Sequence, residues 1–514
     1  MSEQLALLPG LLTAHLQLTL FALLAGALIS VPAGVLVSRV RWLDQPVVGT
    51  AGVIQTVPSL ALLAVMVPLL SALGLRGIGF LPAFIGLVLY SLLPMLRNTV
   101  TGLTGVDPAL LEAADGVGMT PAERLLRVEL PVALPVVLAG VRTSTVLTVG
   151  VATLSTPVGA PSLGNYIFSG LQTRNLTAVL VGCVAAAALA VCLDALVRGL
   201  GHAILRRHRG RLAASLGVLA VLYLYTGASF VQGWQTRDAG RVVVGAKTFT
   251  EQYILSELLS AQVRARTAAT TTEVVSSLGS TVAFDALRAG EIDVYVDYSG
   301  TILATIMQRR AAGASREAVL AEVGRFLRET HGIHLVGALG FENAYALAMR
   351  RDDARRLSVT RISDLTAHAR RLHIGGDYEF FGRPEWRALR DAYRLTFAST
   401  RTMDASLMYA AVANGDVDVI SAFSTDGRIA AFDLLVLDDD RATIPPYDAV
   451  ILAGARLTRE RPDVVAALQA LSGQIDADRM RRMNLAVDRD GASPSAVAAT
   501  LLREIHDRRS TQDD

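Results

Sequence analysis

Between long apolar stretches, residues 112–131 form a polar loop that reads EAADGVGMTPAERLLRVELP. Asp107 and Pro108 precede it, and this pair predicts a helix that is capped by the aspartate and carries proline at its first position. Gly118 predicts the end of that helix, because glycine readily adopts the left-handed backbone that closes helices. From spacing alone, the simplest interpretation is a hairpin of two short helices between two membrane spans.

The apolar stretches on either side are long enough to cross a membrane. A helix that spans the hydrocarbon core of ~30 Å needs about 20 apolar residues, and a helix satisfies its own backbone hydrogen bonds in lipid. Six stretches reach this length, and we expect Pro58 and Pro157 to break the helices that contain them. The expected spans are 11–37, 47–70, 78–96, 132–153, 176–197 and 212–231.

Arginines are concentrated in alternate loops of this predicted bundle. Because cytoplasmic loops carry an excess of Lys and Arg, these loops predict one common side of the membrane. Loop 112–131 is then cytoplasmic, while the start of the chain and everything after residue 231 are extracytoplasmic. The arginines are Arg39 and Arg41; Arg97, Arg124 and Arg127; and Arg198, Arg206, Arg207, Arg209 and Arg211, whereas Arg76 and Arg174 are exceptions.

The composition changes after about residue 230. Overall, 52% of the 514 residues are hydrophobic and 18% are charged, which is typical of a membrane protein, but from Arg241 onward the chain alternates apolar and charged residues like a soluble domain. The net charge of +2 and the lack of a basic stripe give no indication of nucleic-acid binding.

Cys183 and Cys192 lie in one apolar stretch, and the histidines have no metal-ligand spacing, so we expect neither disulfides nor a metal site. No basic signal region or lipid-carrying cysteine is seen, so we expect the last span to anchor the soluble half.

Loop 112–131 resembles the EAA coupling motif of bacterial ABC-importer permeases. The resemblance rests on the opening Glu112-Ala113-Ala114, on Gly118 and on the closing Leu-Pro that ends at Pro131. It implies that the loop docks on a separate ATP-hydrolysing subunit. The chain has no G-x-x-x-x-G-K-[ST] phosphate loop, so we expect it not to hydrolyse ATP itself.

Other segments are similar to the glycine betaine, carnitine and choline branch of these importers. In the permease half these are the segment 55–62, QTVPSLAL, and the outer loop 159–170, which ends GNYIFSG. In the soluble half, short predicted strands at 242–245, 291–295, 372–375 and 416–421 alternate with helices, which indicates parallel α/β sheets. Four passages there resemble the branch's binding proteins: 245–252, 289–301, 343–347 and 418–429.

The resemblance implies an α-helical transmembrane permease followed by an α/β, two-lobed Venus flytrap. The expected domains are a permease over 1–232, a linker over 233–240 and a solute-binding domain over 241–510. Lobe 1 is expected to contain 241–345 and 446–510, and lobe 2 to contain 346–445.

A quaternary ammonium is recognised by aromatic faces, and a carboxylate by Lys, Arg, hydroxyl or N–H groups. By resemblance, Tyr298 and Phe423 are cage residues, and Lys247 and Ser280 are carboxylate contacts. Ser277 stands where relatives carry a cage tyrosine, so a ligand bulkier than glycine betaine is expected, such as ergothioneine. Two further candidates are Asp297, which would orient a Lys or Arg, and Arg428, which would either hold ligand or pair within its lobe. Tyr345, Phe380 and Trp386 are expected to be core residues.

Two other functions are weighed. An enzyme is disfavoured because no nucleophile elbow, metal signature or phosphate loop is present. A ligand-gated receptor or channel is disfavoured because all six spans precede an intact binding domain. We therefore expect a multi-pass protein of the bacterial inner membrane, acting as a homodimer with an ATPase partner and a small zwitterionic solute.

Overall fold

The structure, a computed structural model, describes residues 2–173, 175–235, 240–267, 271–309 and 315–513. It contains two compact units. The first consists of Met1–Phe168 and Thr177–Ala239, and the second of Ser169–Leu176 and Gly240–Asp514. Half of the expected linker, residues 236–239, lies outside the described residues.

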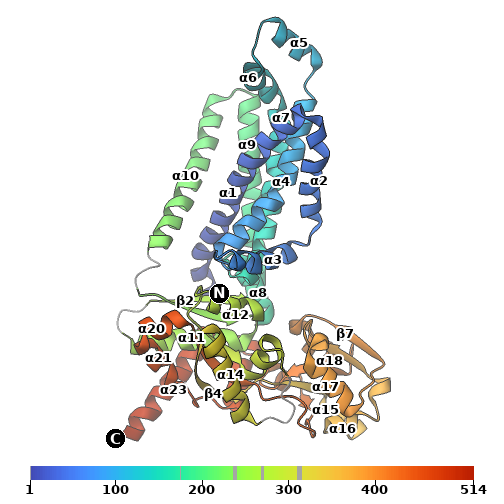
Figure 1. Ribbon diagram of the computed structural model, residues 1–514, viewed down its shortest axis with the longest axis vertical. Helices are drawn as coiled ribbons and strands as arrows, with labels where there is room; N and C mark the ends of the chain where they lie inside the picture. The colour runs from blue at the N-terminus through green and yellow to red at the C-terminus, as the bar shows by residue number, and fades with distance from the viewer. Residues whose placement is uncertain (1, 174, 236–239, 268–270, 310–314, 514) are drawn as a thin grey trace. The chain divides into compact units, whose positions relative to one another are not determined.

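The first unit is a bundle of membrane-length helices (Figure 1). In its described part, five helices are long and apolar enough to span a membrane, and one bent pair makes up to six. The six expected spans therefore correspond to five helical segments and this pair. The principal helices are α1 (Ser2–Arg39), α2 (Asp44–Thr56), α3 (Ser59–Ala72), α4 (Phe80–Thr104), α7 (Leu130–Ala152), α8 (Gly164–Gln172), α9 (Leu176–Leu205) and α10 (Arg209–Gln235).

The bent pair is α2 and α3, which corresponds to the expected span 47–70. The two helices meet at an angle of 100°. Pro58 lacks a backbone N–H, and its ring pushes Val57 into an extended conformation, with φ −67° and ψ 128°. The predicted break at Pro58 is confirmed. Pro157 lies in a short 3-10 helix, Thr153–Val158, that ends the fourth span.

Helices α4 and α7 pack closely through small residues. A Cβ on Gly140 would lie 2.6 Å from the carbonyl oxygen of Pro94, so only glycine permits this approach. Helix α7 is also joined to α9 by an ion pair between Arg142 Nε and Asp194 Oδ1 at 2.8 Å. This pair was not predicted from the sequence, because each of the two charges lies within an apolar stretch.

The second unit contains two five-stranded sheets with helices around them (Figure 1). We call the part built on the first sheet lobe 1 and the part built on the second sheet lobe 2. The first sheet has the order β2-β1-β3-β10-β4 and the second β7-β6-β8-β5-β9. The strands are β1 (Val242–Lys247), β2 (Thr272–Leu278), β3 (Val294–Tyr298), β4 (His334–Glu342), β5 (Tyr345–Arg350), β6 (His373–Gly376), β7 (Ser399–Thr402), β8 (Val419–Phe423), β9 (Leu434–Val436) and β10 (Asp448–Ala453).

Helices cover both sheets and complete the α/β fold. Those of lobe 1 are α11 (Thr250–Arg266), α12 (Ser280–Arg288), α14 (Arg316–His331), α20 (Ala455–Glu460), α21 (Pro462–Gln469), α22 (Ala477–Asp488) and α23 (Pro494–Asp513). Those of lobe 2 are α15 (Arg351–Leu357), α16 (Ile362–Leu365), α17 (Pro384–Tyr393), α18 (Ala405–Asn414) and α19 (Arg428–Ala431).

The chain passes between the two sheets twice, once between β4 and β5 and once between β9 and β10. In each sheet three neighbouring strands are parallel, β2-β1-β3 in the first and β7-β6-β8 in the second. The fourth strand, β10 or β5, runs antiparallel to both of its neighbours. A unit of membrane-length helices followed by a two-lobed α/β domain is therefore confirmed as the fold.

The strand expected at 291–295 begins later than predicted. Gly290 has φ +71°, and the N–H of Glu291 bonds back to the carbonyl of Ala286 at 2.9 Å, which closes the end of α12. The chain becomes extended only at Val294, so β3 ends at Tyr298 rather than at Tyr295.

Candidate functional site

A cavity of about 230 Å³ lies between the two lobes of the second unit. Its lining comes from the ends of strands in both sheets and from the loops that follow them, where ligands of α/β proteins usually bind. Lobe 1 contributes Lys247, Phe249, Glu251, Ser280, Tyr298 and Asn343; lobe 2 contributes Tyr345, Asp377, Arg383, Phe423, Thr425 and Arg428; Tyr447 and Asn484 come from the chain after lobe 2.

Four aromatic rings form a continuous row along this cavity. Tyr298 and Phe249 stack with centroids 6.1 Å apart, and Phe249 and Phe423 stack at 6.2 Å with an interplanar angle of 4°. Tyr345 lies 5.0 Å from Phe423. The row joins lobe 1 to lobe 2 and presents π faces to whatever fills the space between them.

Lys247, the last residue of β1, is buried and ion-paired with Asp297. The other oxygen of Asp297 accepts a hydrogen bond from the Tyr295 hydroxyl at 2.5 Å. The Lys247 ammonium also lies 5.4 Å from the centre of the Tyr298 ring. Lys247 is thus a neutralised charge in the cavity wall.

The two cationic residues from lobe 2 are paired as well. Arg383 contacts Glu385 at 3.3 Å and lies 5.0 Å from the centre of the Tyr345 ring. Arg428 binds Asp426 at 2.6 Å and lies over the ring of Tyr409. All three cations that line the cavity therefore already share their charge with a carboxylate.

Glu251 is a buried carboxylate at the junction of the lobes. Its Oε1 accepts hydrogen bonds from the Tyr298 hydroxyl at 2.6 Å and from Asn343 at 3.1 Å. Its Oε2 accepts from Thr425 of lobe 2 at 2.5 Å and from Asn484 at 3.2 Å. Burial raises the pKa of Glu251, and burial beside the Glu251 charge raises the pKa of Tyr298.

A turn of lobe 2, residues 424–428, contacts helix α22 of lobe 1. Arg481 donates to the carbonyl of Ser424 at 3.0 Å, and Asn484 donates to the carbonyl of Thr425 at 2.8 Å. Phe423 directly precedes this turn and Arg428 is its last residue, so the position of the turn fixes where both side chains meet the cavity.

The candidates from the sequence divide into two groups. Tyr298, Phe423, Lys247, Ser280 and Arg428 all line the cavity. Ser277 and Asp297 are not among the lining residues, and both are buried behind it.

Ser277 has a structural environment of its own. It has φ +65°, and its hydroxyl lies 2.9 Å from that of Tyr253. Asp297 holds Lys247, which is the orienting role considered for it.

Several lining residues were missed by sequence reasoning. Phe249 and Glu251 lie inside the quoted passage 245–252, which was a usable signal. Tyr345 was expected in the core, yet it lines the cavity while Phe380 packs behind it, 5.4 Å away. Arg383 and Tyr447 lie outside every quoted passage, so the sequence offered no signal for them.

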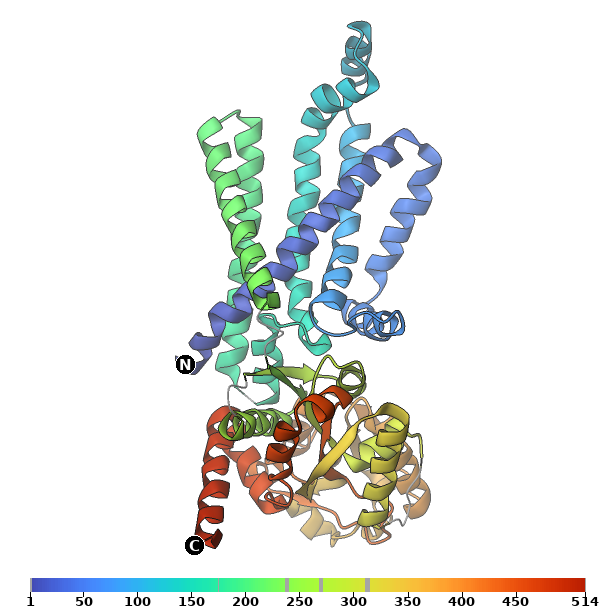
Figure 2. The same cartoon turned by 60° about the vertical axis from the view of Figure 1, so that its left-hand side comes forward.

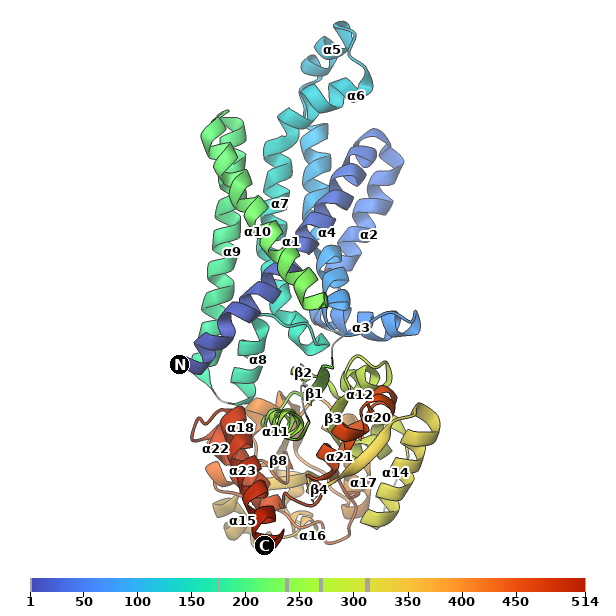
Figure 3. The ribbon, with the colours of Figure 1, turned by 90° about the vertical axis from the view of Figure 1, so that its left-hand side faces the viewer.

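The coupling-type loop forms α5 (Pro108–Gly116) and α6 (Pro121–Arg124), at the end of the helical unit that is remote from α3 (Figure 3). Asp107 caps α5 by accepting from the N–H of Ala109 at 2.9 Å, as predicted. Gly118 has φ +80°, and it and Met119 bond back to Asp115 and Ala114, which completes a Schellman turn.

The side chains of this loop differ in their exposure to solvent. Glu112, Ala113, Gly118 and Pro131 are exposed, whereas Ala114 is buried. Arg124 bridges Asp115 at 2.6 Å and Glu129 at 2.9 Å, and Arg39 of α1 also binds Glu129. These ion pairs connect the loop to the membrane helices.

Two protein families match this chain. Residues 240–504 match the substrate-binding domain of ABC-type glycine betaine transport systems, and residues 25–207 match the inner-membrane component of binding-protein-dependent transport systems.

Individual proteins are also similar to this chain. The chain is 30% identical over 479 residues to the ergothioneine transport permease/ergothioneine binding protein EgtU of Helicobacter pylori (strain G27), covering 91% of this chain and 84% of the relative. It is 44% identical over 180 residues to the choline transport system permease protein OpuBB of Bacillus subtilis (strain 168), and this alignment covers 35% of this chain and 80% of the relative. A solved glycine betaine/carnitine/choline ABC transporter structure aligns with a TM-score of 0.47 and 29% identity, covering 52% of this chain and 98% of that one.

Proposed function

This chain belongs to the family of ABC importer subunits that fuse a permease to a glycine-betaine-type substrate-binding domain, and we propose that it takes up a zwitterion with a quaternary ammonium group. The family imports solutes of the betaine, choline, carnitine and ergothioneine class, so the chain is a transport protein. The identity of the solute and the roles of individual residues are the proposal.

The row of four aromatic rings is the observation that carries this proposal. A quaternary ammonium has no N–H to donate, and each aromatic face that it meets contributes roughly 0.5–2 kcal/mol once water is excluded. We assign the ammonium group to the part of the row between Phe249, Phe423 and Tyr345. The Tyr298 face already has the Lys247 ammonium beside it.

The carboxylate of the solute is assigned to Ser280 and Lys247. Ser280 is the first residue of α12, and the first N–H groups of a helix have no acceptor within the helix. A solute carboxylate at Lys247 would share the ammonium with Asp297. Asp297 would act on the solute indirectly, by holding Lys247, and Arg428 by holding Asp426. Ser277 would support the cavity wall through its contact with Tyr253.

Ergothioneine and carnitine are proposed ahead of glycine betaine. The cavity extends past the aromatic row to polar groups such as Asn343, Asp377 and Thr425, which suit a solute with polar bulk beyond its trimethylammonium head. The relative that aligns along 91% of this chain carries ergothioneine in its name.

Calorimetry on the full chain in mild detergent tests this assignment. Ergothioneine, carnitine, choline, proline betaine and glycine betaine would be titrated into wild type and into Phe423→Ala. We expect ergothioneine or carnitine to bind most tightly and Phe423→Ala to weaken every quaternary ammonium. Tight glycine betaine binding that persists in Phe423→Ala contradicts the proposal.

We assign the domains as 1–232, 233–240 and 241–510. The permease would span the bacterial inner membrane as a homodimer, because one such bundle supplies one coupling loop and family members use two ATPase docking sites. Glu112, Ala113, Ala114, Gly118 and Pro131 would contact the separate ATPase.

Orientation is testable with single cysteines in a chain whose Cys183 and Cys192 are replaced by serine. Glu329 of the binding domain and Thr120 of the loop are both exposed. An impermeant maleimide should label Glu329→Cys in intact cells and Thr120→Cys only after lysis. The opposite pattern would invert the proposed topology.

A further inference from the structure

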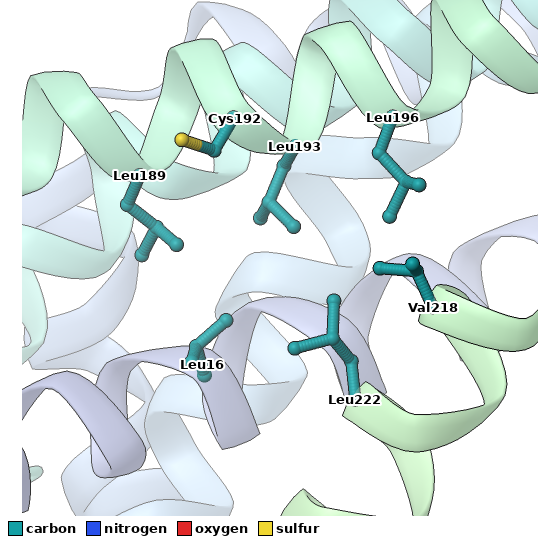
Figure 4. Close-up of a pocket in the computed structure, with 7 residues that line it drawn as sticks. All are labelled: Leu16, Leu189, Cys192, Leu193, Leu196, Val218 and Leu222. Atoms are coloured by element: carbon teal, nitrogen blue, oxygen red, sulfur yellow. The ribbon is translucent and has the colours of Figure 1, made fainter. Parts of the chain in front are cut away.

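An apolar groove of about 360 Å³ lies between α1, α9 and α10 of the helical unit (Figure 4). The side chains from α9 face those from α1 and α10 across the groove, and none of them is charged. Its lining is Leu16, Leu189, Cys192, Leu193, Leu196, Val218 and Leu222.

The two helices that border most of this groove are the least covered of the five single spans. The most apolar 18-residue window is 6% buried in α10 and 17% in α9, against 39–56% in the other three single spans. Figure 2 shows α9 and α10 as a hairpin at the side of the unit.

Helix α10 is fastened to α1 beyond the groove. Tyr225 lies 2.8 Å from the hydroxyl of Thr13, Ser229 accepts from Gln17 at 3.0 Å, and Tyr223 donates to the carbonyl of Leu20 at 3.1 Å. Those tethers all follow Leu222, so the part of α10 nearer the hairpin borders the groove instead.

The hairpin between α9 and α10 carries four exposed arginines: Arg206, Arg207, Arg209 and Arg211. The sequence from residue 195 to residue 237 contains no Asp or Glu, so the hairpin supplies no carboxylate of its own. Positive loops are usual beside membrane spans, but one of these arginines, Arg211, is also aligned with the groove.

Arg211 lies on the same face of α10 as the groove. Val218 and Leu222 follow it by seven and eleven residues, about two and three helical turns. With a rise of 1.5 Å per residue, Arg211 is about 10 Å from the level of Val218 and about 16 Å from that of Leu222. Half of a bilayer hydrocarbon core is about 15 Å, the depth that one acyl chain covers.

We propose that this groove and the hairpin arginines form a binding site for an anionic phospholipid. One acyl chain lies in the groove, and the phosphate lies at Arg211 and its neighbours. If the groove were empty, the side chains that line it would lose dispersion contacts. In a bilayer, lipid acyl chains are the surrounding apolar groups that can make these contacts. Arginines near the membrane surface attract acidic headgroups, and the lipid completes the packing of the helix that leads into the binding domain.

Native mass spectrometry of the full chain tests the site. The chain would be reconstituted with equal amounts of phosphatidylglycerol and phosphatidylcholine of identical acyl chains, then extracted in mild detergent. We expect phosphatidylglycerol to be retained preferentially, with about a fivefold loss of that preference in Arg211→Gln. Val218→Trp, which fills the groove, should remove the retained lipid.

Leu224→Trp is the matched control, because Leu224 is an exposed residue of α10 that does not line the groove. It should leave lipid retention unchanged. Phosphatidylglycerol with a diazirine in its acyl chain should form adducts on peptides containing Leu193 or Leu222.

Two results would overturn the proposal: equal retention of the two lipids, and lipid retention that survives Val218→Trp. If Val218→Trp retains the lipid but loses its dimer, the groove would be assigned to a second copy of the chain.

Discussion

A Cβ on Gly427 would lie 2.5 Å from the backbone nitrogen of Leu485, and the turn of lobe 2 therefore rests directly on the backbone of α22 in lobe 1. The φ of Gly427 is −62°, so glycine is needed there for space and not for backbone freedom. The same turn positions Phe423 and Arg428 at the cavity, which makes this contact a determinant of how the lobes come together.

Gly427→Ala should weaken solute binding without removing any solute contact. The added methyl group must push lobe 2 away from α22, and overpacking of this kind typically costs about 1–3 kcal/mol, or roughly 5- to 150-fold in affinity. Calorimetry measures the affinity, and small-angle scattering of detergent-free nanodiscs measures the closure of the domain.

Gly324→Ala is the control for that experiment. Gly324 lies within α14, where the nearest atom to an added Cβ is 3.8 Å away, so the methyl group fits. Equal losses of solute affinity in Gly427→Ala and Gly324→Ala would contradict the claim that the contact at Gly427 controls closure of the lobes.

Tyr298→Phe and Tyr298→Ala separate the ring from the hydroxyl. The hydroxyl donates to Glu251, so Tyr298→Phe should lower the stability of the binding domain by about 1–2 kcal/mol and change solute affinity little. Tyr298→Ala also removes the ring that stacks on Phe249, and affinity should then fall. Thermal unfolding and calorimetry give the two values, and a large affinity loss in Tyr298→Phe alone would place the hydroxyl on the solute.

Glu251 should make stability depend on pH in a defined direction. Burial raises its pKa above 4.5, so the folded protein takes up a proton more readily than the unfolded chain. The ionised form therefore costs folding free energy at neutral pH, and this cost decreases as the pH falls through the raised pKa toward 4.5. The melting temperature of wild type relative to Glu251→Gln should rise on acidification, and a difference that is constant with pH would contradict this assignment.

Gly118→Ala should impair uptake while solute binding remains intact. Gly118 has φ +80°, and an alanine in this conformation is destabilised by about 1 kcal/mol or more. The substitution should therefore disturb the Schellman turn that ends α5 and sets its orientation. Gly116→Ala is the matched control, because Gly116 has open space and no left-handed backbone. Transport in vesicles with the ATPase, beside calorimetry on the same chain, distinguishes coupling from binding, and equal uptake in the two variants would count against the coupling role.

Local signals were enough to predict the helical bundle and parts of the site. Asp107 as a cap, Gly118 as a helix end and Pro58 as a break all depend on a few adjacent residues. Tyr298 and Phe423 belong to sequence passages that could be compared with a known family.

What could not be predicted depends on contacts between distant segments. The stacking of Phe249 on Phe423 and the pairing of Arg142 with Asp194 arise only when separate elements are brought together. The sequence suggested that Asp297 orients a Lys or Arg, but only the fold identifies that partner as Lys247. The angle at Pro58 likewise depends on packing around the break, because proline alone requires a break but sets no angle.

The short connection between the two halves has a consequence for capture kinetics. Helix α10 ends at Gln235 and β1 begins at Val242, so a link of six residues can extend no further than about 20 Å. A free binding protein must find its permease by diffusion, whereas a tethered one is present at an effective concentration on the order of millimolar. Delivery of solute then becomes a first-order process within one assembly, and uptake should not change when excess soluble binding domain is added outside.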